Sequence, residues 1–245
     1  MAAPTALITG CSRGLGRELA LQFACSGFNL ALICRSDLTS LKETARQCLK
    51  SNVETLYRKC DVRDSKAVEN FVRDAAEKFD TLDVLINNAG VAHSELLNRI
   101  TDEQFDRLIG TNLTGQMNCI RAAAKKMMKQ RSGHIVNIGS LSATEGVRGA
   151  AAYSASKCAL IGLTQSAAAE LGRFNIKVNM VMPGYLLTDM TAEMTTGRLE
   201  AITRQNLLGR PSDFDEVCRF ILHLVQMQNV SGQTFNLDSR IRPWS

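Results

Sequence analysis

Short apolar runs alternate along the chain with longer segments in which apolar residues recur every three or four positions. The short runs are typical of strands buried on both faces, and the longer spacing is typical of helices that cover a sheet. The pattern predicts strands at Thr5–Thr9, Asn29–Cys34, Glu54–Lys59, Leu82–Asn87, Gly133–Ile138, Ile176–Val181 and Thr234–Leu237. It predicts helices at Leu15–Ser26, Thr39–Ser51, Ser65–Phe79, Asp102–Gln130 with a break near Gly110 or Gly115, Tyr153–Arg173 and Asp213–Gln228.

This alternation of strand and helix indicates an α/β fold. Strands joined by helices run parallel, and right-handed crossovers place helices on both faces of the sheet. We therefore expect a doubly wound, Rossmann-type, mostly parallel sheet of seven strands. No linker, repeat or low-complexity stretch divides the chain, so residues 1–245 are expected to form a single domain. The segment Leu186–Pro211, rich in Thr, Met and Gly, is predicted to be a mobile lid.

Composition narrows the possible classes of protein. Of the 245 residues, 45% are hydrophobic and 22% are charged, which excludes a mainly disordered chain. The net charge of +5 permits an acidic ligand or partner but does not indicate a nucleic-acid surface. No apolar run is long enough for a membrane helix and no signal peptide is visible, so we expect a cytoplasmic protein. The eight cysteines form no CxxC pair and the three histidines lie far apart, so we expect free thiols and no metal site.

A glycine-rich segment follows the first predicted strand and precedes the first predicted helix. Thr9–Gly16 has the spacing G-x-x-x-G-x-G, in which Gly10 suits a tight turn. Gly14 and Gly16 would let the backbone approach a pyrophosphate at the helix N-terminus, where N–H groups face an anion. The alternative is a turn that needs a positive φ and binds nothing.

The end of the second strand bears on which dinucleotide would bind. An acidic residue there would accept hydrogen bonds from the ribose 2′-hydroxyl of NAD, but this strand is followed by Arg35. Arg35 and Arg13 can pair with a 2′-phosphate, which favours NADP(H). Asp37 lies close in sequence, so use of NAD(H) stays open. The alternative is that both arginines are solvated surface residues.

Tyr153 and Lys157 have the spacing i, i+4, which puts both side chains on one face of a predicted helix. A nearby ammonium favours the phenolate, so Lys157 is expected to lower the pKa of Tyr153 and make it a general acid or base. Ser140 follows the fifth strand, and Asn112 and Asn87–Gly90 come from the same edge of the sheet. The alternatives are a structural Tyr–Lys pair and an asparagine that satisfies backbone groups at a helix kink.

Together these motifs resemble the short-chain dehydrogenase/reductase family. The resemblance follows the family's order over the whole chain, through TGxxxGxG at Thr9–Gly16, Asp61-Val62, NNAG at Asn87–Gly90, Asn112, Ser140, YxxxK at Tyr153–Lys157 and Pro183-Gly184. It implies an NADP(H)-dependent oxidoreductase in which hydride passes between a nicotinamide ring and a carbonyl carbon.

The resemblance also implies roles for single residues. Tyr153 would exchange a proton with the substrate oxygen, and Ser140 would hydrogen-bond that oxygen. Lys157 would bind the nicotinamide ribose, and Asn112 would hold a water in a proton relay. The implied cofactor contacts are Gly10, Cys11, Ser12, Arg13, Gly14, Leu15, Gly16, Arg35, Asp61, Val62, Asn88, Ala89, Gly90, Tyr153, Lys157, Pro183, Gly184, Leu186 and Thr188.

Within the family, Val178–Thr191 is similar to the 3-oxoacyl-acyl-carrier-protein reductases, which reduce a thioester on an acidic carrier protein with NADPH. This resemblance implies a homo-oligomer, either a dimer or a tetramer. It also implies carrier docking at Arg131 and at neighbouring lysines, unless these belong to a solvated helix end. Two positions depart from the pattern. Phe174 stands where a second basic docking residue is expected, and the terminal Asp-Gly-Gly is replaced by Asp238–Arg240. The lysines that neighbour Arg131 in the candidate docking cluster are Lys125, Lys126 and Lys129.

Two other functions stay open at this point. Another carbonyl reductase or alcohol dehydrogenase, acting on a sugar, steroid, quinone or small ketone, would differ only in its substrate pocket. A catalytically idle assembly subunit is the non-enzymatic alternative, and the intact set of candidate catalytic residues argues against it. We expect neither a nucleic acid nor a membrane as a partner.

Overall fold

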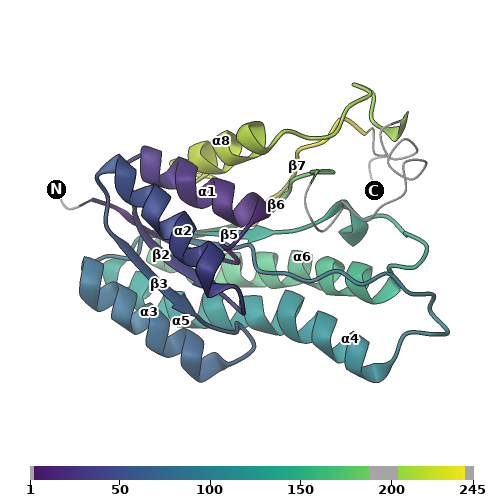
Figure 1. Cartoon of the computed structure of the whole chain (residues 1–245), viewed down its shortest axis with the longest axis horizontal. Helices are drawn as coiled ribbons and strands as arrows, with labels where there is room; N and C mark the ends of the chain where they lie inside the picture. The colour runs from purple at the N-terminus through teal and green to yellow at the C-terminus, as the bar shows by residue number, and fades with distance from the viewer. Residues whose placement is uncertain (1–2, 188–203, 241–245) are drawn as a thin grey trace.

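A parallel sheet forms the centre of the computed structural model, which describes residues 3–187 and 204–240 (Figure 1). Its seven strands pair in the order β3-β2-β1-β4-β5-β6-β7, and every pair is parallel. The predicted doubly wound α/β sheet is confirmed. The order along the sheet reverses between β1 and β4, and at such a point the carboxyl ends of the strands leave a crevice for ligands. The strands are β1 (Thr5–Thr9), β2 (Asn29–Cys34), β3 (Thr55–Lys59), β4 (Val84–Asn87), β5 (Gly133–Ile138), β6 (Ile176–Met182) and β7 (Thr234–Asn236).

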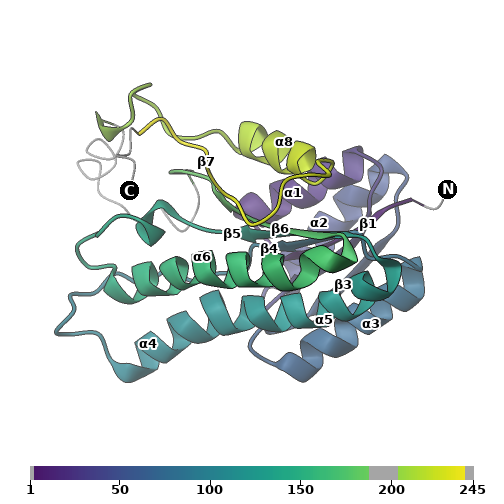
Figure 2. The same ribbon diagram turned by 180° about the vertical axis from the view of Figure 1, so that it is seen from behind.

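Helices cover both faces of the sheet (Figures 1 and 2). On one face lie α1 (Gly14–Cys25), α2 (Leu38–Cys48) and α8 (Phe214–Leu224). On the other lie α3 (Ser65–Phe79), α5 (Gly115–Gln130) and α6 (Ala151–Leu171), and α4 (Asp102–Ile109) continues into α5 through the π-helical turn η2 (Gly110–Thr114). The short 3₁₀ turns are η1 (Leu49–Ser51), η3 (Leu141–Ala143) and η4 (Gly172–Phe174). None of the described helices combines the length and apolarity that a membrane span needs.

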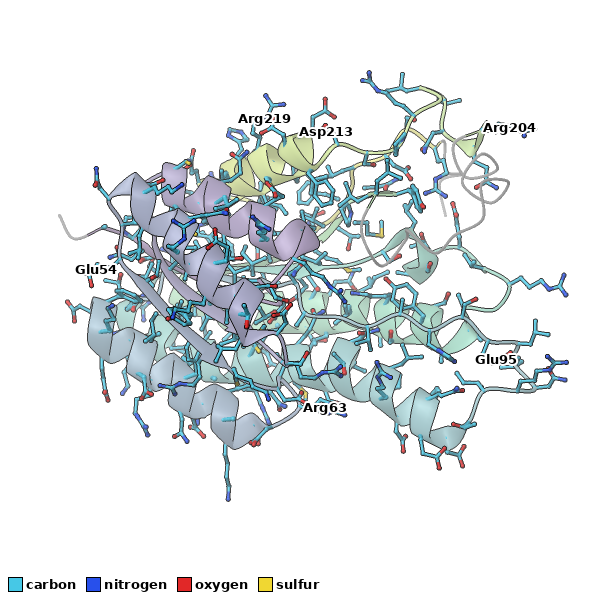
Figure 3. The ribbon with its side chains drawn as sticks, viewed as in Figure 1. Glu54, Arg63, Glu95, Arg204, Asp213 and Arg219 are labelled. Carbon is cyan, nitrogen blue, oxygen red and sulfur yellow. The ribbon has the colours of Figure 1, made fainter. Side chains whose placement is uncertain are left out.

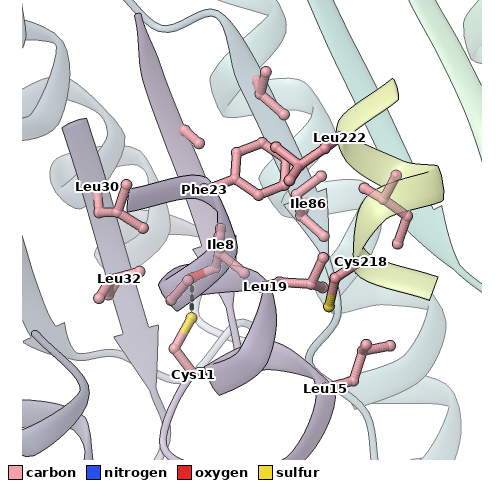
Figure 4. Packing of buried hydrophobic residues seen from close by; sticks show 14 of the residues in the cluster. Ile8, Cys11, Leu15, Leu19, Phe23, Leu30, Leu32, Ile86, Cys218 and Leu222 are labelled. Carbon is pink, nitrogen blue, oxygen red and sulfur yellow. Dashed lines mark hydrogen bonds between the residues drawn. The ribbon is translucent and has the colours of Figure 1, made fainter. Parts of the chain in front are cut away.

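Two clusters of buried apolar side chains pack the helices against the sheet. In the first, Ile8 and Ile86 of the strands meet Leu19 and Phe23 of α1, and Leu222 of α8 closes the cluster (Figure 4). The second joins the opposite face to α3, α5 and α6. Full burial of one such side chain is worth roughly 1.5–3 kcal/mol, so these contacts hold the strand ends in a fixed arrangement. Six of the eight cysteines are buried, and all eight are free thiols.

Several element boundaries differ from the prediction. α6 begins at Ala151, two residues before Tyr153. The last helix begins after its N-cap Asp213 and ends at Leu224 rather than Gln228, because the next residues form tighter i→i−3 hydrogen bonds. The predicted break between α4 and α5 is a π-helical turn, so the helix keeps its direction with one wider turn. Most of the predicted lid, residues 188–203, lies outside the described residues.

Candidate active site

The glycine-rich loop joins β1 to α1 at the point where the strand order reverses. Gly10 has φ +74° and Gly14 has φ +56°, a region that glycine enters without strain. A Cβ on Gly16 would lie 2.2 Å from the Gly10 carbonyl oxygen, so the first turn of α1 packs directly on the loop. Glycine at these three positions therefore keeps the N-terminus of α1 open to an anion.

The segment after β4 holds this loop in place. The Asn88 side-chain amide donates to the carbonyl oxygens of Thr9 and Gly10, at 2.9 and 3.2 Å. Thr9 Oγ1 in turn accepts hydrogen bonds from the backbone N–H groups of Asn88 and Ala89, at 3.0 and 2.8 Å. These bonds fix the carboxyl ends of β1 and β4 to each other. The side chain of Asn88 thus stabilises the conformation of the glycine-rich loop.

A cavity of about 290 Å³ opens between these loops. Most residues predicted to contact a dinucleotide line it. Within the glycine-rich segment, Cys11 and Gly16 do not line it, because the Cys11 thiol points into the core and donates to Ile8 O at 2.9 Å, and Gly16 is packed on Gly10. The lining residues are Gly10, Ser12, Arg13, Gly14, Leu15, Ile33, Cys34, Arg35, Ser36, Cys60, Asp61, Val62, Asn88, Ala89, Gly90, Val91 and Thr111.

Some lining residues were missed by the sequence analysis. Ile33, Ser36, Cys60, Val91 and Thr111 are examples, and each lies within two residues of a position that was predicted. The carboxyl ends of neighbouring parallel strands converge, so the residues next to each motif also reach the crevice. Proximity to the end of a buried strand was the signal that could have found most of them.

Two arginines that line the cavity, Arg13 and Arg35, are exposed, whereas the acids in or beside the lining are already engaged. Asp37 caps α2 by accepting the Ser40 N–H at 3.0 Å, and this bond holds the pKa of Asp37 below its usual value. Asp61 pairs with Arg63 at 2.6 Å (Arg63 is labelled in Figure 3), and that guanidinium lowers the pKa of Asp61. Arg35 lines the cavity and its side chain is exposed. The rim can therefore receive an anionic group.

Asn112 occupies the π-helical turn and is fully buried. Its amide nitrogen donates to Val91 O at 2.9 Å and to Ser156 Oγ at 3.1 Å. Its Oδ1 accepts the Val91 N–H at 2.8 Å. Both amide protons are therefore used within the protein, and one lone pair of Oδ1 is left over. From the wider turn, the Asn112 side chain therefore links the loop after β4, at Val91, to α6, at Ser156.

Lys157 lies one helical turn beyond Tyr153 on the buried side of α6. Its Nζ donates to Ile138 O at 2.8 Å and lies 5.9 Å from the centre of the Tyr153 ring. Burial lowers the pKa of Lys157 to about 8. A Cβ placed on Gly90 would be 3.8 Å from this Nζ and 3.4 Å from Asn112 Oδ1. The Gly90 end of the cavity thus meets the candidate catalytic residues.

Tyr153 and Ser140 are brought together as predicted, but the predicted pKa shift of Tyr153 is wrong in direction. Burial raises the pKa of the phenol, and the hydrogen bond from Ser140 lowers it by less. The expected lowering by Lys157 does not dominate, because desolvation of the buried phenol is the largest influence on its pKa. Tyr153 is therefore a neutral phenol near pH 7, with a proton to give.

The remaining predicted cofactor residues follow β6. Gly184 has φ +76°, and Leu186 is buried in the first apolar cluster. Neither these residues nor Pro183 lines the cavity described above. Thr188 lies outside the described residues. The described part of the chain contains no group of three or more His, Cys, Asp or Glu that could hold a metal ion.

The candidate docking arginine lies at the opposite edge of the sheet. Arg131 follows α5 and precedes β5, and its guanidinium donates to the backbone oxygen of Arg173 at 3.2 Å. The Arg173 guanidinium lies 4.8 Å from the Phe174 ring centre. Arg173 thus supplies a second cation beside Arg131. Lys157 and the end of α6 at Leu171 are roughly 20 Å apart along the helix axis, so this pair is remote from Tyr153 in the same chain.

Comparisons with known proteins agree with this geometry. A sequence model of the short chain dehydrogenase family matches residues 4–199. A 3-oxoacyl-acyl-carrier-protein reductase of Staphylococcus aureus is 35% identical over 236 residues, which cover 96% of each chain. The structure of a dehydrogenase/reductase from Sinorhizobium meliloti superposes with a TM-score of 0.91 at 30% identity, covering 98% of this chain and 95% of that one. An actinorhodin polyketide ketoreductase, solved with NADPH, has a TM-score of 0.90 at 31% identity and 98% coverage of both chains.

Proposed function

The chain belongs to the short-chain dehydrogenase/reductase family of oxidoreductases, and on that basis we propose that it reduces a 3-oxoacyl thioester with NADPH. One observation carries the proposal. A neutral Tyr153, hydrogen-bonded to Ser140, stands beside Lys157 where the glycine-lined cavity ends. This arrangement supplies a proton donor next to a site for a dinucleotide, which is what reduction of a carbonyl group requires.

The cavity fits a dinucleotide. A Cβ on Gly10 would lie 3.0 Å from Ala89 Cα, so only glycine lets the loop pack this closely on the segment after β4. We assign the pyrophosphate to the N-terminus of α1, the adenine to Asp61 and Val62, and a 2′-phosphate to Arg35 with Arg13. Once bound, NADPH would supply the hydride for the carbonyl carbon.

Tyr153 is assigned the proton that goes to the carbonyl oxygen. The carbon gains a hydride and the oxygen gains a proton, so the ketone becomes a secondary alcohol and the phenol is left as a phenolate. A proton donor must hold its proton at the working pH, and burial keeps the pKa of Tyr153 high enough for that. Ser140 is the second group on the same oxygen, because its hydroxyl can donate to a developing negative charge.

Lys157 and Asn112 support this proton transfer. The Lys157 ammonium has three N–H donors and gives one to Ile138 O, so two remain for a ribose hydroxyl. With a pKa of about 8, Lys157 is mostly charged near pH 7 and stabilises the phenolate that forms. Asn112 retains one lone pair on Oδ1, which can accept from a water that returns a proton to the site.

The substrate class rests on the similarity to reductases that are 33–35% identical to this chain over 96–97% of its length. The alternative is reduction of a different carbonyl compound. It stays a candidate because the chain is also 30% identical to a solved dehydrogenase/reductase whose substrate is a different matter from its fold. The two functions share fold, cofactor site and proton donor. They differ in the groups around the substrate, where the hollow lined by Ser94–Leu96 and Val147–Gly149 lies (Glu95 is labelled in Figure 3).

An acidic carrier protein is the proposed partner, with Arg131 and Arg173 as the docking cations. These arginines lie at the amino edge of the sheet, whereas the carboxyl edge holds Tyr153. A carrier bound there could deliver its acyl group only to the site of another copy of the chain. The partner proposal therefore includes a homo-oligomer in which one copy binds the carrier and its neighbour reduces the thioester.

The test is oxidation of NADPH or NADH, followed by nicotinamide absorbance, with acetoacetyl-CoA and then with acetoacetyl carrier protein. We expect faster turnover with NADPH and a higher kcat/KM with the carrier than with the CoA thioester. Activity on a sugar, steroid, quinone or small ketone, without activity on either thioester, would move the enzyme to the second substrate class. Normal NADPH binding with no turnover of any carbonyl compound would contradict an enzymatic function.

Arg35→Ala should change the choice of cofactor. Loss of a charge-assisted pair costs about 1.5–3 kcal/mol, so the Kd of NADPH should rise about 10- to 100-fold. The Kd of NADH should change less than about threefold, because NADH has no 2′-phosphate. Fluorescence titration of both cofactors measures this difference. Arg46→Ala on α2, where the arginine pairs with Glu43, is the matched control, and equal weakening of both cofactors by Arg35→Ala would rule out the 2′-phosphate role.

A further inference from the structure

The last described residues of the chain pack against the active-site side of the sheet. Leu237 N–H donates to Met182 O at 2.9 Å, which continues the pairing of β7 with β6. A Cβ on Gly184 would lie 2.7 Å from Asp238 Cβ. Ser239 Oγ accepts the Leu208 N–H at 3.2 Å. Residues 237–240, which we call the C-terminal segment, therefore contact both the turn after β6 and the chain that leads into α8.

Arg240 ends this segment in a buried ion pair. Its Nε and Nη2 donate to Asp238 Oδ2 at 2.7 and 2.5 Å. The Asp238 side chain is 1% exposed and the Arg240 side chain 13%. A guanidinium so little exposed keeps a fixed position, because the buried Asp238 carboxylate would otherwise lose the cation that balances its charge.

The same guanidinium reaches the loop between Ser140 and Tyr153. Arg240 Nη1 lies 3.6 Å from Glu145 Oε2, and the Glu145 side chain is 38% exposed. Glu145 is anchored to the start of that loop by its N–H, which donates to Leu141 O at 3.1 Å. Beyond it, Gly146 has no atom near its Cβ direction, and Val147 is exposed. The loop therefore gains a long-range tie at Glu145, about 95 residues away in sequence from the group that makes it.

We propose that Arg240 is a positioning residue for the substrate side of the active site. It ties the C-terminal segment to the loop 141–150 through Glu145, and this loop directly follows Ser140 and leads into α6, the helix that carries Tyr153. Arg240 touches neither substrate nor cofactor in this role. The inference rests on the proposed carbonyl reduction, since it is through Ser140 and Tyr153 that the loop affects chemistry. A displacement of about 1 Å in such a loop can cost a large factor in rate.

Glu145→Gln is the primary test, because it removes one charge from a partly exposed side chain and leaves the Arg240–Asp238 pair intact. With acetoacetyl-CoA as substrate, we expect kcat/KM to fall about tenfold, mostly through KM. The Kd of NADPH and the Tm should stay as in the wild type, because the cofactor loops and the core are untouched. Glu170→Gln, the same change at an exposed position of α6, is the control. It should leave kcat/KM, KM, the Kd of NADPH and the Tm unchanged.

Hydrogen exchange tests the tie without any substrate. In the free protein, Glu145→Gln should speed exchange of the amides of residues 141–150 about threefold. Arg240→Ala should speed it at least as much, because it also leaves the buried Asp238 carboxylate without its cation, and adding Glu145→Gln to Arg240→Ala should change little more. Unchanged exchange in both would overturn the proposal, whether or not the enzyme reduces thioesters. Faster exchange with unchanged kcat and KM on an accepted carbonyl substrate would also overturn it. Absence of thioester reduction by the wild type would instead count against the proposed function alone.

Discussion

Tyr153→Phe should lower kcat for carbonyl reduction about a thousandfold and leave the Kd of NADPH near its wild-type value. The substitution removes one oxygen and its proton while the ring stays in place beside Lys157. A positioned general acid contributes on the order of 10²–10⁴ in rate, and water has no fixed position from which to replace it. Single-turnover reduction of acetoacetyl-CoA and fluorescence titration of NADPH measure the two quantities separately.

A matched control separates this effect from a general loss of structure. Tyr57 lies on the edge strand β3 and is 37% exposed, so Tyr57→Phe removes a phenolic oxygen far from the loop that carries Ser140. Its kcat should equal that of the wild type. If Tyr153→Phe kept more than about a tenth of the wild-type kcat, the proton would have to come from another group, and the assignment of Tyr153 would be wrong.

The arrangement of elements could be predicted because local patterns and topology agree in this chain. The runs at Leu30–Cys34 and Ile135–Ile138 are too short for helices and have no polar face, so they fit a covered parallel strand. Once such strands alternate with helices, the strands run parallel and their carboxyl ends lie along the same edge of the sheet. That rule alone places the glycine loop near Ser140, although 124 residues separate Gly16 from that serine.

The electrostatics of the site could not be predicted from spacing. The i, i+4 relation correctly puts Tyr153 and Lys157 on one helix face, but it does not show how deeply each is buried. Burial raises the pKa of Tyr153 and lowers that of Lys157, and Ile138 O accepts a hydrogen bond from the lysine ammonium. Desolvation depends on everything packed around a group, so it appears only in the folded structure.

The contacts of the C-terminal segment could not be predicted from the sequence either. In the sequence, Asp238–Arg240 is a departure from a family pattern and carries no positive signal. In the structure, Arg240 is nearly buried between Asp238 and Glu145. Pairing of residues about 95 positions apart cannot be read from periodicity, because periodicity reports only neighbours along one element.

Gly16→Ala should abolish measurable NADPH binding and lower the free energy of unfolding by about 2 kcal/mol. The added Cβ would lie 2.2 Å from Gly10 O and 2.4 Å from Asn88 Nδ2. Gly10 cannot retreat without losing the hydrogen bond from Asn88, and Asn88 cannot retreat without losing Thr9 O as well. The helix or the loop must therefore move, and the N–H groups that would face a pyrophosphate lose their alignment.

Urea denaturation and NADPH titration of the same preparation test the two parts of this expectation. Gly172→Ala is the matched control, since a Cβ there meets no atom within 4 Å and Gly172 has an ordinary helical φ of −55°. That variant should bind NADPH normally and be as stable as the wild type or slightly more stable, because alanine loses less backbone entropy than glycine. Normal NADPH affinity in Gly16→Ala would mean that the cofactor does not depend on the packing of α1 against Gly10, and the pyrophosphate would have to be assigned elsewhere.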